Sequence, residues 1–198
     1  YIFSCKIKTM KHLDIGSGLT PKNPYGADEL YGIDIQENLE NVPNYKSVNL
    51  FTNKIPFDSD FFDSVSAFDF LEHVPRVWIR DNGQSSFPFI DLMNEIYRVL
   101  KTKGRFYAMT PYYPRSEAFQ DPTHVNIITK NTHEYFCGST CYGRYYGFLG
   151  NFKKIRVKTT SVKLGKKGVN ASVIQRIYDL KRKLMGKHTH LLWELEKV

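Results

Sequence analysis

Short apolar runs alternate with amphipathic or polar stretches along this chain. A run of four to eight apolar or alternating residues bounded by glycine, proline or polar residues predicts a strand. The order of these signals predicts an α/β fold, with a doubly wound, mostly parallel sheet and an antiparallel strand from a C-terminal hairpin. The predicted strands are Lys11 to Gly16, Leu30 to Ile35, Tyr45 to Leu50, Phe62 to Phe70, Arg105 to Pro111 and Phe152 to Leu164.

Two segments show the 3.6-residue apolar period of a helix. The first is Asp91 to Gly104, where the terminal glycine suits a left-handed cap. The second is Asn170 to Gly186, with Asn170 as its N-cap and a basic polar side. We expect the apolar side of this second helix to pack on the sheet. Residues 76–91 are polar and rich in turn formers, so they predict a surface loop.

The length of the chain suits one domain. Its 198 residues with 41% hydrophobic content can bury a single core. We therefore expect residues 1–198 to form one domain, with a core over residues 11–165 and a basic amphipathic helix over 170–186.

A formal net charge of +8 changes the range of partners to consider. Basic proteins attract nucleic acid, anionic membranes or acidic small molecules. No RNA-binding or helix-turn-helix signature is present, so a nucleic-acid partner is disfavoured. A solvated basic surface is the preferred interpretation, and a membrane-surface role for the helix at residues 170–186 stays open as an alternative.

Three cysteines, Cys5, Cys137 and Cys141, argue against a disulfide framework and favour a reducing compartment. His133 lies near two of them, but the spacing matches no standard zinc pattern, so we predict unbridged thiols and no metal. No apolar run approaches the roughly 20 residues that span a bilayer. The first ten residues are too short and polar for a secretory signal, and we expect a cytoplasmic protein.

A glycine turn follows the first predicted strand. Asp14, Gly16 and Gly18 form the pattern D-x-G-x-G, in which glycine lets the backbone turn sharply and approach a ligand. The second strand ends in Asp34, and an acid at that position can accept hydrogen bonds from ribose hydroxyls. Pro21 occupies the place of the third glycine of the dinucleotide motif, so nicotinamide binding is disfavoured.

Four segments together resemble a known family. LDIGSG, YGIDI, IPFDSDFFDSVSAFDFLEHV and MNEIYRVLKTKGRFYAMTP are similar, in order, to the successive motifs of class I S-adenosylmethionine-dependent methyltransferases, and most closely to the type 11 group. The resemblance covers roughly Lys11 to Pro111. It implies a Rossmann-like sheet that binds S-adenosyl-L-methionine and releases S-adenosyl-L-homocysteine.

The resemblance also implies which positions hold the cofactor. The glycine turn would line its methionine and ribose side, and the acid after the second strand would hold the ribose hydroxyls. The residues after the third strand would contact adenine, and those after the fourth would lie beside the methyl group. These positions are Asp14, Gly16, Gly18, Asp34, Ile35, Asn49, Leu50, Asp69 and Phe70.

One segment departs from the family pattern. The family has a helix directly after the glycine turn, but here Pro21, Pro24 and Gly26 fall within that stretch. Both residue types disfavour a helix interior. We expect a helix that is short or displaced.

The acceptor is expected beside the segment TPYYPRSEAFQDPTHVNIIT, which follows the fifth strand at the carboxyl edge. Transfer of a methyl group to a hydroxyl requires loss of a proton, and histidine suits that task. His124 is the candidate base, with Asp121 as its orienter or as an alternative base. An equally weighted alternative is that Asp121 and His124 only hold the loop in place by hydrogen bonds. We interpret His73 as a structural residue. Arg115, Arg144 and Lys153 are candidates for holding an anionic acceptor.

These observations lead to one preferred function and two rivals. The preferred function is O-methylation of a small-molecule or carbohydrate-type acceptor, and an anionic acceptor is one option. The rival enzyme is an N- or carboxyl-methyltransferase. The rival from another class is a catalytically silent module that binds S-adenosylmethionine and works through a partner.

Overall fold

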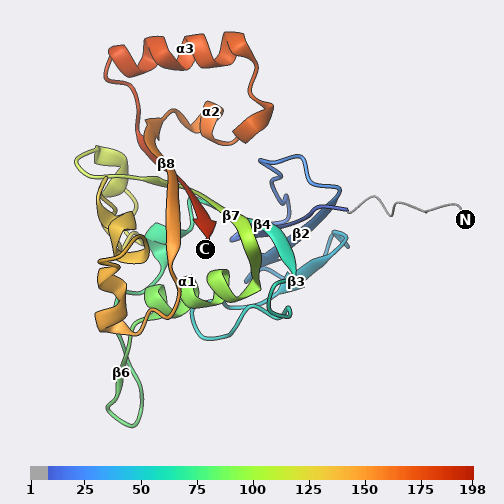
Figure 1. Cartoon of the computed structure of the whole chain (residues 1–198), viewed down its shortest axis with the longest axis vertical. Helices are drawn as coiled ribbons and strands as arrows, with labels where there is room; N and C mark the ends of the chain where they lie inside the picture. Colours follow the sequence, from blue (N-terminus) through green and yellow to red (C-terminus); the bar gives the residue numbers. More distant parts are fainter. Residues whose placement is uncertain (1–8) are drawn as a thin grey trace, which may run out of the picture.

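A seven-stranded sheet forms the centre of the protein in a computed structural model that describes residues 9–198 (Figure 1). The strand order is β3-β2-β1-β4-β7-β9-β8, in which the first five strands are parallel and β9 runs antiparallel to both of its neighbours, β7 and β8. The predicted fold class is therefore confirmed. The strands are β1 (Lys11–Ile15), β2 (Glu29–Asp34), β3 (Tyr45–Ser47), β4 (Phe62–Phe68), β7 (Leu100–Pro111), β8 (Phe152–Thr160) and β9 (His190–Lys197).

The two faces of the sheet differ in chemistry because side chains alternate along each strand. On β1, Leu13 and Ile15 face a large apolar core. Helix α1 (Pro88–Val99) packs against this core through residues such as Met93 and Ile96. On the opposite face of β1, the buried side chains are His12 and Asp14, which are polar. A buried polar row thus underlies the glycine turn.

No helix covers this second face between β1 and β2. Residues 16–28, all of them described, form turns, as the prolines and glycine in the segment led us to expect. Tyr25 from this segment packs edge-on against Tyr107 of β7, with ring centroids 5.9 Å apart. Its hydroxyl donates a hydrogen bond of 3.0 Å to Glu194 of β9. Tyr25 therefore attaches the middle of this loop to β7 and β9.

Helix α1 begins and ends earlier than the sequence indicated. It spans Pro88–Val99, and Leu100 already has an extended backbone as the first residue of β7. Gly104 was predicted as the helix cap, and this prediction is wrong, because Gly104 is a residue of strand β7. A Cβ there would lie 2.7 Å from the carbonyl oxygen of Lys101, so close backbone packing explains the glycine.

The remaining described elements are short. The predicted loop at residues 76–91 contains a small hairpin of β5 (Trp78–Ile79) and β6 (Ser85–Ser86). Cys137 and Cys141 are unbridged thiols, as predicted, whereas Cys5 lies outside the described residues. The 3-10 helices are η1 (Leu71–His73), η2 (Ser116–Ala118), η3 (Thr132–Phe136), η4 (Tyr142–Tyr146) and η5 (Gly168–Asn170).

The C-terminal third holds the largest departures from expectation. Strand β9, which lies between β7 and β8, was not predicted, although Leu191, Trp193 and Leu195 alternate along it and are buried. Between β8 and β9 the chain leaves the sheet to form α2 (Val162–Gly165) and α3 (Val173–Leu184). Figure 1 shows α3 at one end of the molecule, standing away from the sheet.

Helix α3 corrects two predictions. Ser172, and not Asn170, is its N-cap, and it forms a capping box with Gln175. Its apolar side does not pack on the sheet, since Ile174 and Leu184 are 78% and 82% exposed. Within the described part of the chain, no helix is long and apolar enough to cross a membrane.

The contrast between β9 and α3 can be measured with matched truncations. Leu195→Ala removes a fully buried core side chain, and we expect it to lower the free energy of unfolding by about 2–5 kcal/mol. Leu184→Ala removes a side chain that is mostly in solvent, and we expect a change within about 0.5 kcal/mol. Urea denaturation followed by circular dichroism gives both values. Equal losses would show that α3 packs on the protein after all.

Candidate active site

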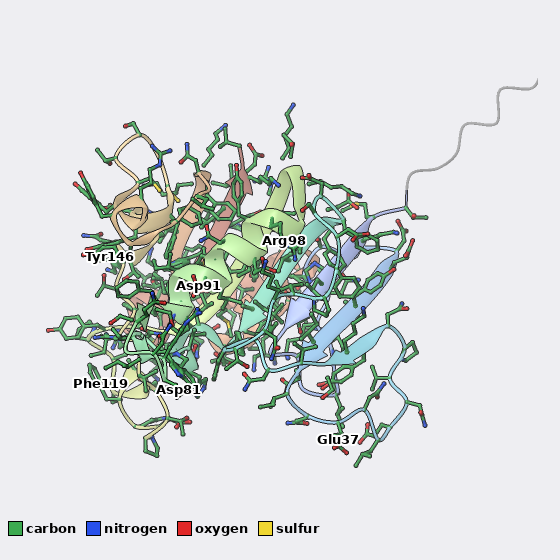
Figure 2. All side chains as sticks on the ribbon, turned by 90° about the horizontal axis from the view of Figure 1, so that it is seen from below. Glu37, Asp81, Asp91, Arg98, Phe119 and Tyr146 are labelled. Carbon is green, nitrogen blue, oxygen red and sulfur yellow. The ribbon has the colours of Figure 1, made fainter. Side chains whose placement is uncertain are left out.

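The loops that carry the predicted site residues share one edge of the sheet. Parallel strands present their carboxyl ends together, and ligands of open α/β sheets bind beyond those ends. Figure 2 places Glu37, from the loop after β2, and Phe119, from the loop after β7, along the same edge of the molecule. Arg98, at the end of α1, lies away from this edge (Figure 2).

The glycine turn and the segment after β4 are in direct contact. Gly16 has a φ of +63°, and a Cβ placed on it would lie 2.3 Å from the ring of Phe70. Only glycine satisfies both the backbone angle and the space. Phe70 also stacks on Phe51, with ring centroids 5.8 Å apart. The turn, the end of β4 and the loop after β3 therefore meet at one aromatic contact.

Gly18 and Asp34 form the other half of this turn. The Gly18 amide donates a hydrogen bond of 2.9 Å to Asp34 Oδ2, and the Gln36 amide donates one of 3.1 Å to Oδ1. Gly18 has a φ of +54°, and no atom lies within 4 Å of the position its Cβ would take. The open space beside a fixed carboxylate fits an adenosine group whose ribose hydroxyls bond to the carboxylate. Ile35, the next residue, is exposed.

Asp14 lies beneath the turn and has a structural set of partners. Its Oδ2 accepts from the Lys22 amide at 2.8 Å, and its Oδ1 accepts from the Ser66 hydroxyl at 2.6 Å. Burial raises the pKa of this carboxyl to about 6, although both hydrogen bonds and the nearby Lys22 ammonium oppose the shift. Asp14 therefore fastens the helix-free loop to β1 and β4.

His12 extends this polar row along β1. Because Ser66 donates its proton to Asp14, its oxygen accepts from His12 Nε2 at 2.8 Å. His12 Nδ1 then accepts from the Ser64 hydroxyl at 2.7 Å. Burial lowers the pKa of His12 to about 3, so the ring is neutral and the tautomer is fixed by its neighbours.

The adenine-side residues lie at the end of β3. Asn49 Oδ1 accepts from the Phe51 amide at 3.0 Å and so holds its own turn. Leu50 is buried and, with Phe51, lines a groove of about 560 Å³. Helix α1 and the β5–β6 hairpin form its other walls. The predicted adenine position therefore borders a cavity large enough for a base.

Asp69 contacts two residues from the C-terminal third of the chain. Its Oδ1 lies 3.1 Å from His190 Nε2 on β9, and its Oδ2 lies 3.2 Å from Lys166 Nζ after α2. Burial would raise the pKa of Asp69, but His190 and the Lys166 ammonium together hold it below its usual value. Asp69 and Phe70, which are both predicted to lie beside the methyl group, therefore have different partners in the structure.

The loop after β7 is locked onto the segment after β4. The Glu72 carbonyl oxygen accepts from the amides of Val125 and Asn126, both at 2.9 Å. Asn126 also donates through its side-chain amide to the carbonyl oxygens of Leu71 and Val74. This bracing brings the predicted base and orienter against η1.

Three side chains converge where these two segments meet. His124 Nε2 lies 4.0 Å from Glu72 Oε1 and 3.9 Å from Asp121 Oδ2. The His124 ring is nearly buried, and its Nδ1 lies 3.3 Å from the Ala118 carbonyl oxygen. Both separations exceed the length of a hydrogen bond, so His124 Nε2 is bonded to neither carboxylate.

Glu72 is a candidate site residue that sequence reasoning missed. It is fully buried, its Oε2 accepts from the Thr110 hydroxyl at 2.9 Å, and its Oε1 has no hydrogen-bond partner. Burial raises its pKa to about 7. An unpaired buried carboxyl is costly and clusters at functional sites. Its position beside His73 in LEHV was visible, but its burial was not.

His73 and Asp121 complete the cluster. Thr123 bridges them, because its hydroxyl lies 2.9 Å from His73 Nδ1 and 2.6 Å from Asp121 Oδ1. Hydrogen bonds from Thr123 lower the pKa of Asp121. Glu72, His73 and His124 each offer a ligand atom, and these atoms lie within 4.8 Å of one another. Such a set could also hold a divalent cation.

The candidates for an anionic acceptor are dispersed. Lys153 lies at the start of β8, opposite Glu196 and at the edge where the parallel strands begin. This position corrects the suggestion that it faces the acceptor. Tyr113 and Phe119 do lie at the carboxyl edge, where they pack edge-on and are about half exposed.

Comparison with known proteins identifies the fold and the type of domain. Residues 13–108 match the profile of a family described as a methyltransferase domain. No curated protein sequence matches the chain significantly.

Solved structures support this result at low sequence identity. An S-adenosylmethionine-dependent methyltransferase from Archaeoglobus fulgidus is 15% identical to this chain, with a TM-score of 0.57. The alignment covers 96% of this chain and 86% of that one. One from Mesorhizobium loti is 14% identical with a TM-score of 0.54, and the alignment covers 96% of this chain and 92% of that one. The [4+2]-cyclase SpnF is 13% identical with a TM-score of 0.51, covering 96% and 74%. The fold is therefore shared with an enzyme named for a different reaction.

The carboxyl of Asp14 should make stability depend on pH in a specific direction. Its pKa is about 6 in the folded protein and near 3.8 when unfolded, so the folded state binds the proton more tightly. Stability should then fall as the pH rises from about 4 to above 6. Relative to Asp14→Asn, the wild type should lose on the order of 1–3 kcal/mol between pH 5 and 7.5 in denaturant unfolding. Parallel pH profiles for the two proteins would contradict this assignment.

Proposed function

Because residues 13–108 form a methyltransferase domain of the S-adenosylmethionine-dependent class, we propose that the chain methylates a hydroxyl of a small-molecule or carbohydrate-type acceptor. The observation that carries the proposal is the convergence of His124 Nε2 and the unpaired Glu72 Oε1 at the carboxyl edge. Glu72 follows Phe70 by two residues, and Phe70 touches the glycine turn. Acceptor and cofactor sites therefore adjoin.

The cofactor-binding positions are part of this proposal. Gly16 and Gly18 give the backbone close approach, Asp34 holds the ribose, and Leu50 with Phe70 contacts the adenine side. Asp14 acts indirectly by holding the loop, and Asn49 by shaping the turn before Leu50. When bound, S-adenosylmethionine supplies a methyl group activated by its sulfonium.

The chain's own residues then have to orient the acceptor and remove its proton. His124 Nε2 takes the proton of the acceptor hydroxyl, while the Ala118 carbonyl oxygen holds the ring through Nδ1. Asp121 and Glu72 flank the same nitrogen, so a carboxylate stabilises the imidazolium that forms. Tyr113 and Phe119 provide an aromatic rim that a sugar or small ring can lie against.

The rival acceptors fit the cluster less well. A carboxylate acceptor has no proton to lose and would be repelled by Asp121 and by ionised Glu72. An amine acceptor remains the second candidate, since it also needs a proton acceptor. The catalytically silent module is disfavoured because it has no need of an unpaired buried carboxyl, whose retention costs stability.

Cofactor binding tests the Gly18–Asp34 assignment. We expect Asp34→Ala to weaken the affinity for S-adenosylhomocysteine by tenfold or more, because two hydroxyl-to-carboxylate hydrogen bonds are lost, each worth about 1.5–3 kcal/mol before compensation. Isothermal titration calorimetry on protein freed of carried-over ligand gives the affinity. Glu37→Ala, three residues away in an exposed loop, is the matched control and should bind normally. Unchanged affinity in Asp34→Ala would refute the assignment.

Turnover tests the role of His124. We expect His124→Ala to bind S-adenosylhomocysteine normally but to lower the methylation rate by about 10²–10⁴-fold, because the base is lost. The measurement is release of S-adenosylhomocysteine over a panel of hydroxylated acceptors. His133→Ala, a histidine in η3, is the control for loss of an imidazole elsewhere.

Three results would redirect the proposal. Undiminished turnover in His124→Ala would remove this residue as the base. Loss of wild-type turnover in a chelator, with recovery on adding a divalent cation, would assign Glu72, His73 and His124 to a metal instead. Turnover on amines alone would make the enzyme an N-methyltransferase.

A further inference from the structure

Helix α3 is attached to the protein by its polar side. Asp179 is its one buried residue, and its Oδ1 accepts hydrogen bonds from the amide and hydroxyl of Ser161 at the end of β8. His188 lies 3.2 Å from the same oxygen and is itself buried. This is the reverse of a normal surface helix, which packs its apolar side inward.

The apolar side of α3 consequently faces outward. Val173, Ile177, Leu180 and Leu184 fall at the spacing of one stripe, and Asp179 lies on the opposite side of the helix. Ile174 and Tyr178 lie next to the stripe, where they line a groove between α3 and α2. These six side chains are between 57% and 82% exposed. Single exposed apolar residues are ordinary, but a contiguous stripe of this kind marks an interaction surface.

The segment between β8 and β9, which contains α2 and α3, carries nearly all of the net charge. Residues 162–187 contain eight lysines and arginines against the single Asp179, which is a net charge of +7. The rest of the chain has 20 basic and 19 acidic residues. Since Asp179 is buried, α3 presents only basic groups beside its apolar stripe. These groups are Arg176, Lys181, Arg182 and Lys183.

We propose that α3 docks the protein onto an anionic lipid bilayer surface. A short helix with an apolar stripe and a basic polar side lies in the plane of the interface, with its apolar side among the acyl chains and its lysines and arginines at the headgroups. A second copy of this chain fits less well, because two α3 helices packed stripe to stripe would bring like charges together.

Docking would also set the position of the active site. The segment between β8 and β9 is flanked by Thr160 and His190, which pair with each other. His190 also pairs with Pro111 at the carboxyl end of β7. Lys166, next to α2, contacts Asp69 at the end of β4. The segment between β8 and β9 therefore leaves the sheet at the edge that carries the candidate active site. A docked α3 would hold that edge near the lipid surface.

Vesicle co-sedimentation of the full chain tests the inference. We expect wild-type protein to pellet with vesicles of phosphatidylglycerol and phosphatidylcholine, to bind pure phosphatidylcholine roughly tenfold or more weakly, and to lose binding at high salt. Ile177→Ser/Leu184→Ser removes apolar contacts and keeps the charge. Lys181→Gln/Lys183→Gln removes charge and keeps the stripe. Each double variant should lower the partition coefficient by roughly tenfold.

A matched control separates the stripe from surface hydrophobicity in general. Leu149→Ser changes a side chain that is 89% exposed and whose amide bonds to Asn94 of α1, and it should bind vesicles like the wild type. Because all of the altered side chains on α3 lie mostly in solvent, the variants should fold, and circular dichroism checks this.

Three results would overturn the proposal. One is absence of vesicle binding by the wild type, and another is equal binding by the wild type and both double variants. The third is concentration-dependent dimerisation in sedimentation velocity that Ile177→Ser/Leu184→Ser abolishes while vesicles are not bound, which would assign the stripe to a second copy.

Discussion

The buried carboxyl of Asp14 holds the ligand-binding edge together. It joins β1 to β4 through Ser66 and fixes the loop after β1 through the Lys22 amide. That loop has no helix whose packing would otherwise position it. The carboxyl is desolvated and its pKa is raised, so the arrangement costs stability in exchange for a fixed glycine turn. The contact between Gly16 and Phe70 depends on this fixation.

Much of the parallel half of the sheet was predictable from local pattern. Strands β1, β2 and β4 are short apolar runs that end at Ile15, Asp34 and Phe68, and the prolines after the glycine turn correctly argued against a long helix there. The end of α1 was placed too late because Leu100 continues the helical period, whereas pairing of β7 with β4 decides its backbone. Strand pairing is a non-local interaction that no window of sequence contains.

The site was predictable in its residue types more than in its geometry. His124 and Asp121 do converge, but their partner Glu72 comes from another loop, and its burial depends on Thr110 and on the bracing by Asn126. Asp69 and Phe70 are neighbours in sequence but have different partners, because Asp69 pairs with Lys166 and His190 whereas Phe70 contacts Gly16. For α3 the period was read correctly, and the error lay in assuming that an apolar side always turns inward.

The pairing of Thr160 with His190 has a consequence for how this chain can diverge. Since β8 and β9 adjoin at that point, a tight hairpin would connect them equally well, and residues 161–189 form an insertion whose two ends are already neighbours. Such an insertion can lengthen, shorten or change composition without altering the register of the sheet. The segment that would bind lipid and the loops of the candidate active site are thus separate parts of the sequence. Each can evolve at its own rate.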